Sequence, residues 1–174
     1  MPPSPGLLTA GDLVAHARMS TPEAFRAFMG GPVLVGAPPK TGEEGGWSFK
    51  TVSHQVVTDH SLGVVLMEED WVFALKKAAG ASFAGTVLVG RAGSNDVCIP
   101  HPSISKLHAR LRRGPAGELA IQDAGSSNGT SVNDKPLTGD VSVTLVDGAS
   151  VVLGHCRFRY LSAEKLHKVL RRFP

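Results

Sequence analysis

Residues 86–97 read TVLVGRAGSNDV and residues 103–109 read SISKLHA; two further blocks follow, IQDAGSSNGTSVN at 121–133 and LVDGASVVLG at 145–154. Short apolar runs alternate in these blocks with clusters of Gly, Ser, Asn and Asp. This alternation predicts several short strands joined by turns, hence an all-β sandwich or barrel. The turns carry Arg91, Ser105, Lys106, Ser127 and Asn128. Polar and cationic groups gathered on loops above a rigid sheet indicate a recognition surface.

The composition of the 174-residue chain limits the classes to which it can belong. Hydrophobic residues make up 42% of it, enough for a core, and charged residues only 19%, which argues against a disordered chain. The net charge of +3 permits anionic partners. No block of Lys and Arg resembles a DNA-binding arm, and aromatic residues, at 6%, supply few stacking groups. We therefore expect no nucleic-acid partner.

Cysteine and histidine usage gives no sign of a metal site. Cys98 and Cys156 are isolated, so they form neither a disulfide framework nor a metal-binding spacing. The seven histidines are scattered without paired spacing. We expect no metal and no cofactor. Residues 1–6 lack a charged leader and no apolar run is long enough for a bilayer, which favours a soluble, cytoplasmic protein with no membrane partner. The Gly-, Ala- and Val-rich composition is compatible with a bacterial source.

Residues 1–62 are predicted to be an accessory segment of short helices and strands. Thr9 and Thr21 are placed to cap two helices, and Pro22 suits the first position of the second helix. That helix should end at Gly30 and present one apolar face made of Phe25, Phe28 and Met29. Such a face packs on its own domain more often than it docks a partner. Strands are expected at 32–36 and 47–52, and no motif assigns the segment a function.

The order of several short motifs indicates a specific family resemblance. Gly90-Arg91 is followed by Ser-x-x-His at 105–108, by Asp-x-x-Ser-x-Asn-Gly-Thr-x-Val-Asn at 123–133, by Asp-Gly at 147–148 and by Val-x-Leu-Gly at 151–154. This order resembles the forkhead-associated (FHA) domain. The resemblance implies a β-sandwich of about eleven strands in residues 63–174. We predict an all-β protein with a short N-terminal α/β extension and a C-terminal helix capped by Ser162.

The resemblance also implies that loops at one end of the sandwich bind phosphothreonine peptides. By position in the motifs, Arg91 and Ser105 contact the phosphate and Lys106 adds a further charge. Ser127 touches the phosphate or the peptide backbone, and Asn128 hydrogen-bonds the peptide backbone. A phosphothreonine carries nearly two negative charges and three acceptor oxygens, which suit the forked donors of an arginine.

Four further residues are expected to support this site: Gly90, His108, Gly129 and Thr130. Ser105, His108 and Asp123 also raise the possibility of a catalytic triad. That interpretation is rejected because no nucleophile-elbow motif is present and because the family uses its histidine to brace the loops. We expect a non-enzymatic signal-transduction module.

The expected partner is a phosphothreonine-containing protein, either a Ser/Thr kinase or its substrate. An alternative is a phosphate-independent assembly or scaffold protein that uses the FHA fold and the N-terminal segment. The sequence leaves open the identity of the kinase, the preference for residues that flank the phosphothreonine, and the oligomeric state.

Overall fold

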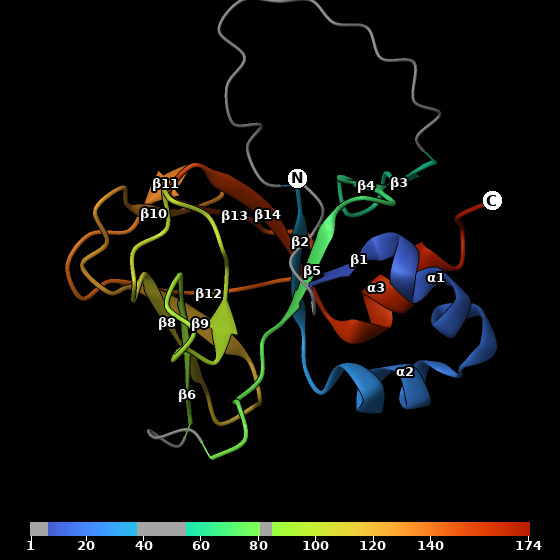
Figure 1. Cartoon of the computed structure of the whole chain (residues 1–174), viewed down its shortest axis with the longest axis horizontal. Helices are drawn as coiled ribbons and strands as arrows, with labels where there is room; N and C mark the ends of the chain where they lie inside the picture. Colours follow the sequence, from blue (N-terminus) through green and yellow to red (C-terminus); the bar gives the residue numbers. More distant parts are fainter. Residues whose placement is uncertain (1–6, 38–54, 81–84) are drawn as a thin grey trace, which may run out of the picture.

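Two large sheets and one hairpin account for the strands in the described part of the chain. The computed structural model describes residues 7–37, 55–80 and 85–174 (Figure 1). The seven-stranded sheet has the order β1 (Leu8–Thr9), β5 (Trp71–Ala74), β2 (Val33–Gly36), β14 (Cys156–Leu161), β13 (Ser150–Leu153), β10 (Thr130–Val132), β11 (Lys135–Pro136). The five-stranded sheet has the order β12 (Ser142–Thr144), β9 (Leu119–Asp123), β8 (Ala109–Arg113), β6 (Thr86–Gly90), β7 (Val97–Cys98). β3 (Val56–Asp59) pairs only with β4 (Val64–Met67) among the described strands.

The two large sheets enclose one apolar core, which confirms the predicted sandwich. Alternate residues of β6, β8 and β9 point inward, and Val89, Leu111 and Ile121 are fully buried there. From the other sheet, the rings of Phe73 and Phe158 meet edge to face with centroids 5.9 Å apart. Burial of each large apolar side chain contributes about 1.5–3 kcal/mol, so this core supplies much of the stability of the sandwich.

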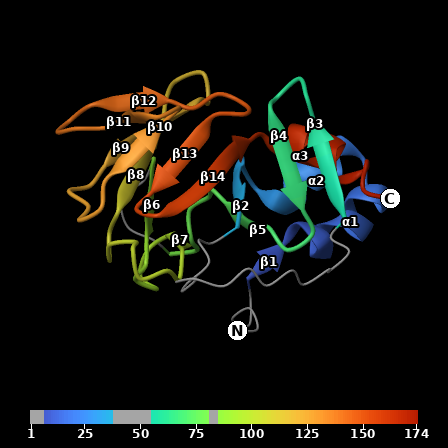
Figure 2. The same cartoon turned by 90° about the horizontal axis from the view of Figure 1, so that it is seen from above.

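A second apolar core lies on the outer face of the seven-stranded sheet. Three helices cover this face: α1 (Ala10–Met19), α2 (Pro22–Met29) and α3 (Ala163–Leu170). Figures 1 and 2 show them grouped on the opposite side of β2 and β5 from the five-stranded sheet. Leu34 of β2 joins the sandwich core, while its neighbours Val33 and Val35 join the helical core. The strand is therefore buried on both faces, between the sandwich and a helical layer formed by α1, α2 and α3.

The N-terminal segment is built into the fold. β2 lies between β5 and β14, with Val35 opposite both Val72 and Arg159. β3 and β4 pair across the predicted boundary between residues 62 and 63, with Val57 opposite Leu66. The division into two domains at that boundary stays a prediction.

The predicted helix ends agree with the caps read from the sequence. Thr9 and Asp12 form a reciprocal capping box at α1, Thr21 caps α2, and Ser162 caps α3. Gly30 ends α2 with φ of 74°, a conformation that glycine adopts without a steric penalty. None of the helices in the described ranges is long and apolar enough to cross a bilayer.

The predicted apolar face of α2 is buried only in part. Phe25 is fully buried and Met29 almost so, but Phe28 is 49% exposed. Phe28 instead lies beside the imidazole of His16, with ring centroids 4.1 Å apart. The strand predicted at 47–52 lies outside the described residues, as do residues 1–6 and 81–84.

Candidate functional site

Arg91 directly follows the last residue of β6 and is held by the loop that carries Ser105. Its backbone N–H donates to the Ser105 carbonyl at 2.9 Å, and its Nε donates to the Ile104 carbonyl at 3.1 Å. The side chain is exposed, and its two terminal nitrogens have no partner among the described residues. Tethering through Nε restricts the guanidinium plane and leaves its outer donors available to a ligand.

Gly90 permits the close approach of these two loops. A Cβ atom at this position would lie 2.3 Å from the Lys106 carbonyl oxygen. Because this obstacle is backbone, a larger residue would push the Ser105–Lys106 loop away from Arg91. The side chain of Asn95 braces the same contact by donating to the carbonyls of Ala92, at 2.9 Å, and Lys106, at 2.6 Å.

Ser105 and Ser127 bring two hydroxyls together from separate loops. The Ser127 N–H donates to Ser105 Oγ at 3.0 Å, and the two Oγ atoms are 3.5 Å apart. Ser105 is partly exposed and Ser127 is exposed. An anion that reaches one hydroxyl can therefore also be reached by the other.

Asn128 and Lys106 extend the polar surface. Asn128 Nδ2 donates to the Ser103 carbonyl at 2.9 Å, which fixes the carboxamide and leaves its oxygen without a partner among the described residues. This oxygen can accept a hydrogen bond from a peptide backbone. Lys106 directly follows Ser105 and is exposed, so its charge adds to the positive potential near Arg91.

His108 lies beneath these loops and joins two of them. It is fully buried; the Ser105 N–H donates to its Nδ1 at 3.1 Å, and its Nε2 lies 3.0 Å from the Gly129 carbonyl. Because Nδ1 accepts from a backbone N–H, the proton of the neutral ring sits on Nε2 and is donated to Gly129. Burial lowers the pKa of His108, which favours this neutral form.

Asp123 organises the loop that carries Ser127 and Asn128. Its carboxylate accepts hydrogen bonds from the N–H groups of Gly125 and Ser126 and from the hydroxyls of Ser126 and Thr130, the last two at 2.6 Å. Burial by itself would raise the pKa of Asp123, but these hydrogen bonds outweigh it and lower the pKa. Gly129, with φ of 80°, completes the turn before Thr130 enters β10.

The geometry excludes a catalytic triad of Ser105, His108 and Asp123. Both ring nitrogens of His108 are engaged by backbone groups, and the Asp123 carboxylate is saturated by its own loop. The imidazole therefore cannot take a proton from the Ser105 hydroxyl. Among the described residues, no group of three His, Cys, Asp or Glu side chains is arranged to hold a metal ion.

The sequence argument missed Ser103 and His101, which anchor the same loops from below. Ser103 Oγ accepts from the His155 N–H at 3.0 Å and lies 2.8 Å from His101 Nδ1. His101 Nε2 is buried without a hydrogen-bond partner among the described residues. The one sequence signal for this contact is Gly154 in the Val-x-Leu-Gly block, where a Cβ atom would lie 2.4 Å from the Ser103 carbonyl oxygen.

The structure thus brings the predicted site residues to one end of the sandwich. Arg91, Ser105, Ser127 and Asn128 are linked through backbone or side-chain hydrogen bonds within the loops at 90–107 and 123–130, and Lys106 lies between them. Gly90, His108, Gly129 and Thr130 lie behind these five residues. The arrangement offers a guanidinium, an ammonium and two hydroxyls to an anion, and a carboxamide to a neighbouring peptide group.

Comparison with known proteins identifies the family of this region. Residues 87–154, less than half of the chain, match the model of the FHA domain. The matched stretch contains all nine residues proposed for the site and its support.

Three curated relatives illustrate the match. An FHA domain-containing protein of Arabidopsis thaliana is 41% identical over 70 residues, 40% of this chain and 18% of the relative. The glycogen accumulation regulator GarA of Mycolicibacterium smegmatis is 34% identical over 80 residues, 46% of this chain and 48% of the relative. The oxoglutarate dehydrogenase inhibitor of Corynebacterium diphtheriae is 32% identical over 90 residues, 50% of this chain and 60% of the relative. The matched residues therefore span from about a fifth to three fifths of these relatives.

Solved structures also show partial similarity to this chain. The FHA domain of an Arabidopsis thaliana hypothetical protein covers 75% of this chain and 85% of its own, with 25% identity and a TM-score of 0.44. Mycobacterium tuberculosis EmbR, solved in complex with a low-affinity phosphopeptide, covers 62% of this chain and 24% of its own, with 21% identity and a TM-score of 0.40. Such TM-scores describe a partial overlap, and the assignment of the domain depends on the family match.

Proposed function

We propose that this chain is a phosphothreonine-dependent interaction module that recruits proteins phosphorylated by a Ser/Thr kinase. The observation that carries the proposal is the tethered guanidinium of Arg91 beside the paired hydroxyls of Ser105 and Ser127. Arg91 and Ser105 bind the phosphate oxygens, Lys106 adds a second cation, and Ser127 contacts the phosphate or the adjacent peptide backbone. Asn128 accepts from, and donates to, the peptide backbone next to the phosphothreonine.

Preorganisation supports this assignment. Arg91 is oriented through Nε, and Ser105 is fixed by contacts with Ser127 and with the buried His108. Loops that are already ordered lose less conformational entropy when a ligand binds. A charge-assisted hydrogen bond contributes about 1.5–3 kcal/mol, so several of them give the phosphate a dominant share of the affinity.

The partner and the setting belong to the same proposal. A phosphothreonine-containing kinase or kinase substrate fits the cationic loops, and a cytoplasmic bacterial protein fits the composition and that class of partner. The names of the relatives describe a regulator and inhibitors, which supports a non-enzymatic role.

The test is binding to matched peptide libraries that carry phosphothreonine, phosphoserine or unmodified threonine at one fixed position. We expect capture of the phosphothreonine set, with at least about 100-fold weaker binding of the unmodified set, because two or more charge-assisted hydrogen bonds are lost. Equal capture of all three sets would contradict the proposal.

Phosphatase treatment separates this function from its alternative. A partner that binds through the phosphate is released when it is dephosphorylated. Binding that survives the treatment would favour the phosphate-independent scaffold, in which the helical layer or another surface holds the partner.

A further inference from the structure

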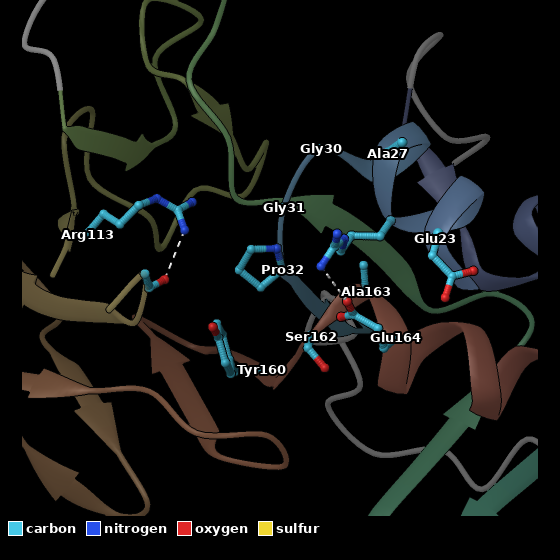
Figure 3. Close-up of a pocket in the computed structure, with 12 residues that line it drawn as sticks. Glu23, Ala27, Gly30, Gly31, Pro32, Arg113, Tyr160, Ser162, Ala163 and Glu164 are labelled. Atoms are coloured by element: carbon cyan, nitrogen blue, oxygen red, sulfur yellow. Dashed lines mark hydrogen bonds and ion pairs between the residues drawn. The ribbon is translucent and has the colours of Figure 1, made fainter. Parts of the chain in front are cut away.

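A cleft of about 550 Å³ lies at the far end of β8 from the phosphate site. β8 begins at Ala109, opposite Val89 and near Arg91, and ends at Arg113, which follows the Arg112–Thr86 pair. At that end the cleft separates the sandwich from the helical layer. Figure 3 shows Arg113 and Tyr160 on the sandwich side, and α2 and the start of α3 on the other side.

Tyr160 is the first indication that the cleft binds a ligand. Its residue surface is only 8% exposed and its ring belongs to the sandwich core. The hydroxyl points into the cleft in Figure 3 and forms no hydrogen bond with the part of the chain that the structure describes. The hydroxyl is not among the buried side-chain atoms that lack a partner, so it is open to the cleft and available to a group that enters it.

Arg113 supplies a charge beside this hydroxyl. Its Nη1 donates to the Gly117 carbonyl at 2.9 Å, which orients the guanidinium and leaves its other donors unpaired among the described residues. Burial, together with Asp147, raises the pKa of Tyr160 although Arg113 opposes the change. The phenol therefore stays protonated at neutral pH and can donate.

The start of α3 adds backbone donors on the opposite wall. Ser162 caps the helix by accepting from the Lys165 N–H, while the N–H groups of Ala163 and Glu164 make no hydrogen bond within the described residues. Ser162, Ala163 and Glu164 all line the cleft. The positive end of the helix dipole favours an anionic group at this position.

The charge balance of the cleft selects a weakly charged anion. Arg26 of α2 and Glu164 of α3 pair at 3.3 Å on the helical wall, and Glu23 also lines the cleft. The Asp147 carboxylate accepts from the backbone N–H and the hydroxyl of Ser162 at the start of α3. These three carboxylates disfavour a multiply charged phosphate, whereas a carboxylate with one charge can be shared by Arg113, Tyr160 and the α3 amides.

We propose that this cleft is a second ligand site of the chain, and that it binds a carboxylate group. The group belongs either to a free small carboxylic acid or to an Asp or Glu side chain of a peptide. In both cases the guanidinium of Arg113 and the hydroxyl of Tyr160 hold its oxygens from one wall, and the first amides of α3 approach from the other.

The test is an NMR titration of the full chain with propionate, which carries one charge, with propionamide as the neutral analogue at constant ionic strength. We expect saturable shifts of the Ala163 and Glu164 amides, with a Kd on the order of 1 mM or tighter, and no such shifts with propionamide. Arg113→Gln should weaken binding by at least about tenfold and Tyr160→Phe by about fivefold, because one removes a charged donor and the other a neutral one.

Arg112→Gln is the matched control, since the alternation of β8 places this exposed arginine on the opposite face of the strand from Arg113. The Arg112→Gln variant should bind propionate as the unmodified chain does. Equal losses in the two arginine variants, or no saturable shift at all, would overturn the site. Tighter binding of inorganic phosphate than of propionate would overturn the preference for a carboxylate.

Two peptides identify the source of the carboxylate. A capped Ala-Glu-Ala peptide that binds at least about tenfold tighter than propionate, while Ala-Gln-Ala does not bind, would assign the site to a protein partner. Tighter binding of propionate would assign it to a free acid. Arg91→Ala should leave either result unchanged, so the carboxylate site is tested independently of phosphothreonine recognition.

Discussion

The two ends of the sandwich are built differently, although each presents an arginine and a hydroxyl. At one end Arg91 and Ser105 lie on loops that are braced from within by His108 and Asp123. At the other end Arg113 and Tyr160 lie on strands, and a separate helical layer supplies the facing wall. Specificity at the first end depends on a local hydrogen-bond network. At the second end the proposed binding depends on how the sandwich and the helical layer, which pack on opposite faces of β2, are placed relative to each other.

Removal of one buried ring from the helical layer should have the largest effect. It should destabilise the fold and leave phosphopeptide binding at the Arg91 end nearly unchanged. Phe25 is fully buried, and its ring centroid lies 5.2 Å from that of His167 in α3. We expect Phe25→Ala to lower the free energy of unfolding by about 3–5 kcal/mol because a cavity remains. Urea denaturation measures the change. Phosphopeptide affinity of the folded variant should stay within about twofold, since the loop network is intact.

Phe28→Ala is the control for this loss. Phe28 lies on the same helix but is 49% exposed, so its truncation should cost no more than about 1 kcal/mol. Similar losses in the two variants would mean that α2 does not stabilise the layer through its buried face.

Arg91→Ala should separate the two ends by function. The variant loses the forked donor and its charge, so we expect phosphopeptide affinity to fall by at least about 30-fold. The free energy of unfolding should change by less than about 0.5 kcal/mol because the side chain is exposed. Isothermal titration calorimetry measures the affinity, and Arg113→Gln is the charge-matched control. Comparable losses in both variants would indicate a general electrostatic attraction instead of a site at the Arg91 end.

Asn128→Ala tests the peptide-backbone contact at the same end. The substitution removes the carboxamide and its hydrogen bond to the Ser103 carbonyl. We expect affinity for phosphothreonine peptides to fall by about three- to tenfold, the effect of one neutral hydrogen bond. Binding of free phosphothreonine, which lacks flanking peptide groups, should change less. An equal loss for the free amino acid would place Asn128 at the phosphate instead.

The sequence predicted the Arg91 end because its chemistry is local. The glycine, arginine, serine and asparagine of that end lie in motifs a few residues long. Position 90 has to be a glycine because the Lys106 backbone approaches it closely. The helices were predictable for a similar reason, since Thr9, Thr21 and Ser162 are caps that act within three residues. These local signals carry no information about how one element packs on another. No local pattern placed β2 between β5 and β14, or exposed Phe28 while burying Phe25.

The cleft could not have been predicted from the sequence at all. Its walls come from α2, from the end of β8 and from the junction of β14 and α3, segments that share no motif. Ser103 shows the same limit at the loop end. Its contacts with Asn128 and His155 span 25 and 52 positions, and only the close approach at Gly154 hints at them.

Mild acid should have the smallest effect, and it should act on the Arg91 end. Burial lowers the pKa of both His101 and His108, and His155 lowers that of His101 further. The unfolded chain therefore takes up protons near the ordinary histidine pKa of about 6.5, before the folded chain does. Stability from these groups is fully present above about pH 7 and is lost as the pH falls through 6.5 toward the lowered folded values. Each histidine contributes at most about 1.4 kcal/mol per pH unit.

Urea denaturation between pH 7.5 and pH 5.5 measures this slope while Asp123, whose pKa is also lowered, stays ionised in both states. We expect His101→Gln to reduce the slope, because the neutral amide replaces one ring that resists protonation. His60→Gln, at an exposed position, should leave the slope unchanged. If His101→Gln also left the slope unchanged, protonation at the unpaired buried Nε2 of His101 would not explain the loss of stability in acid. The slope would then be assigned to His108 and its bond to Gly129.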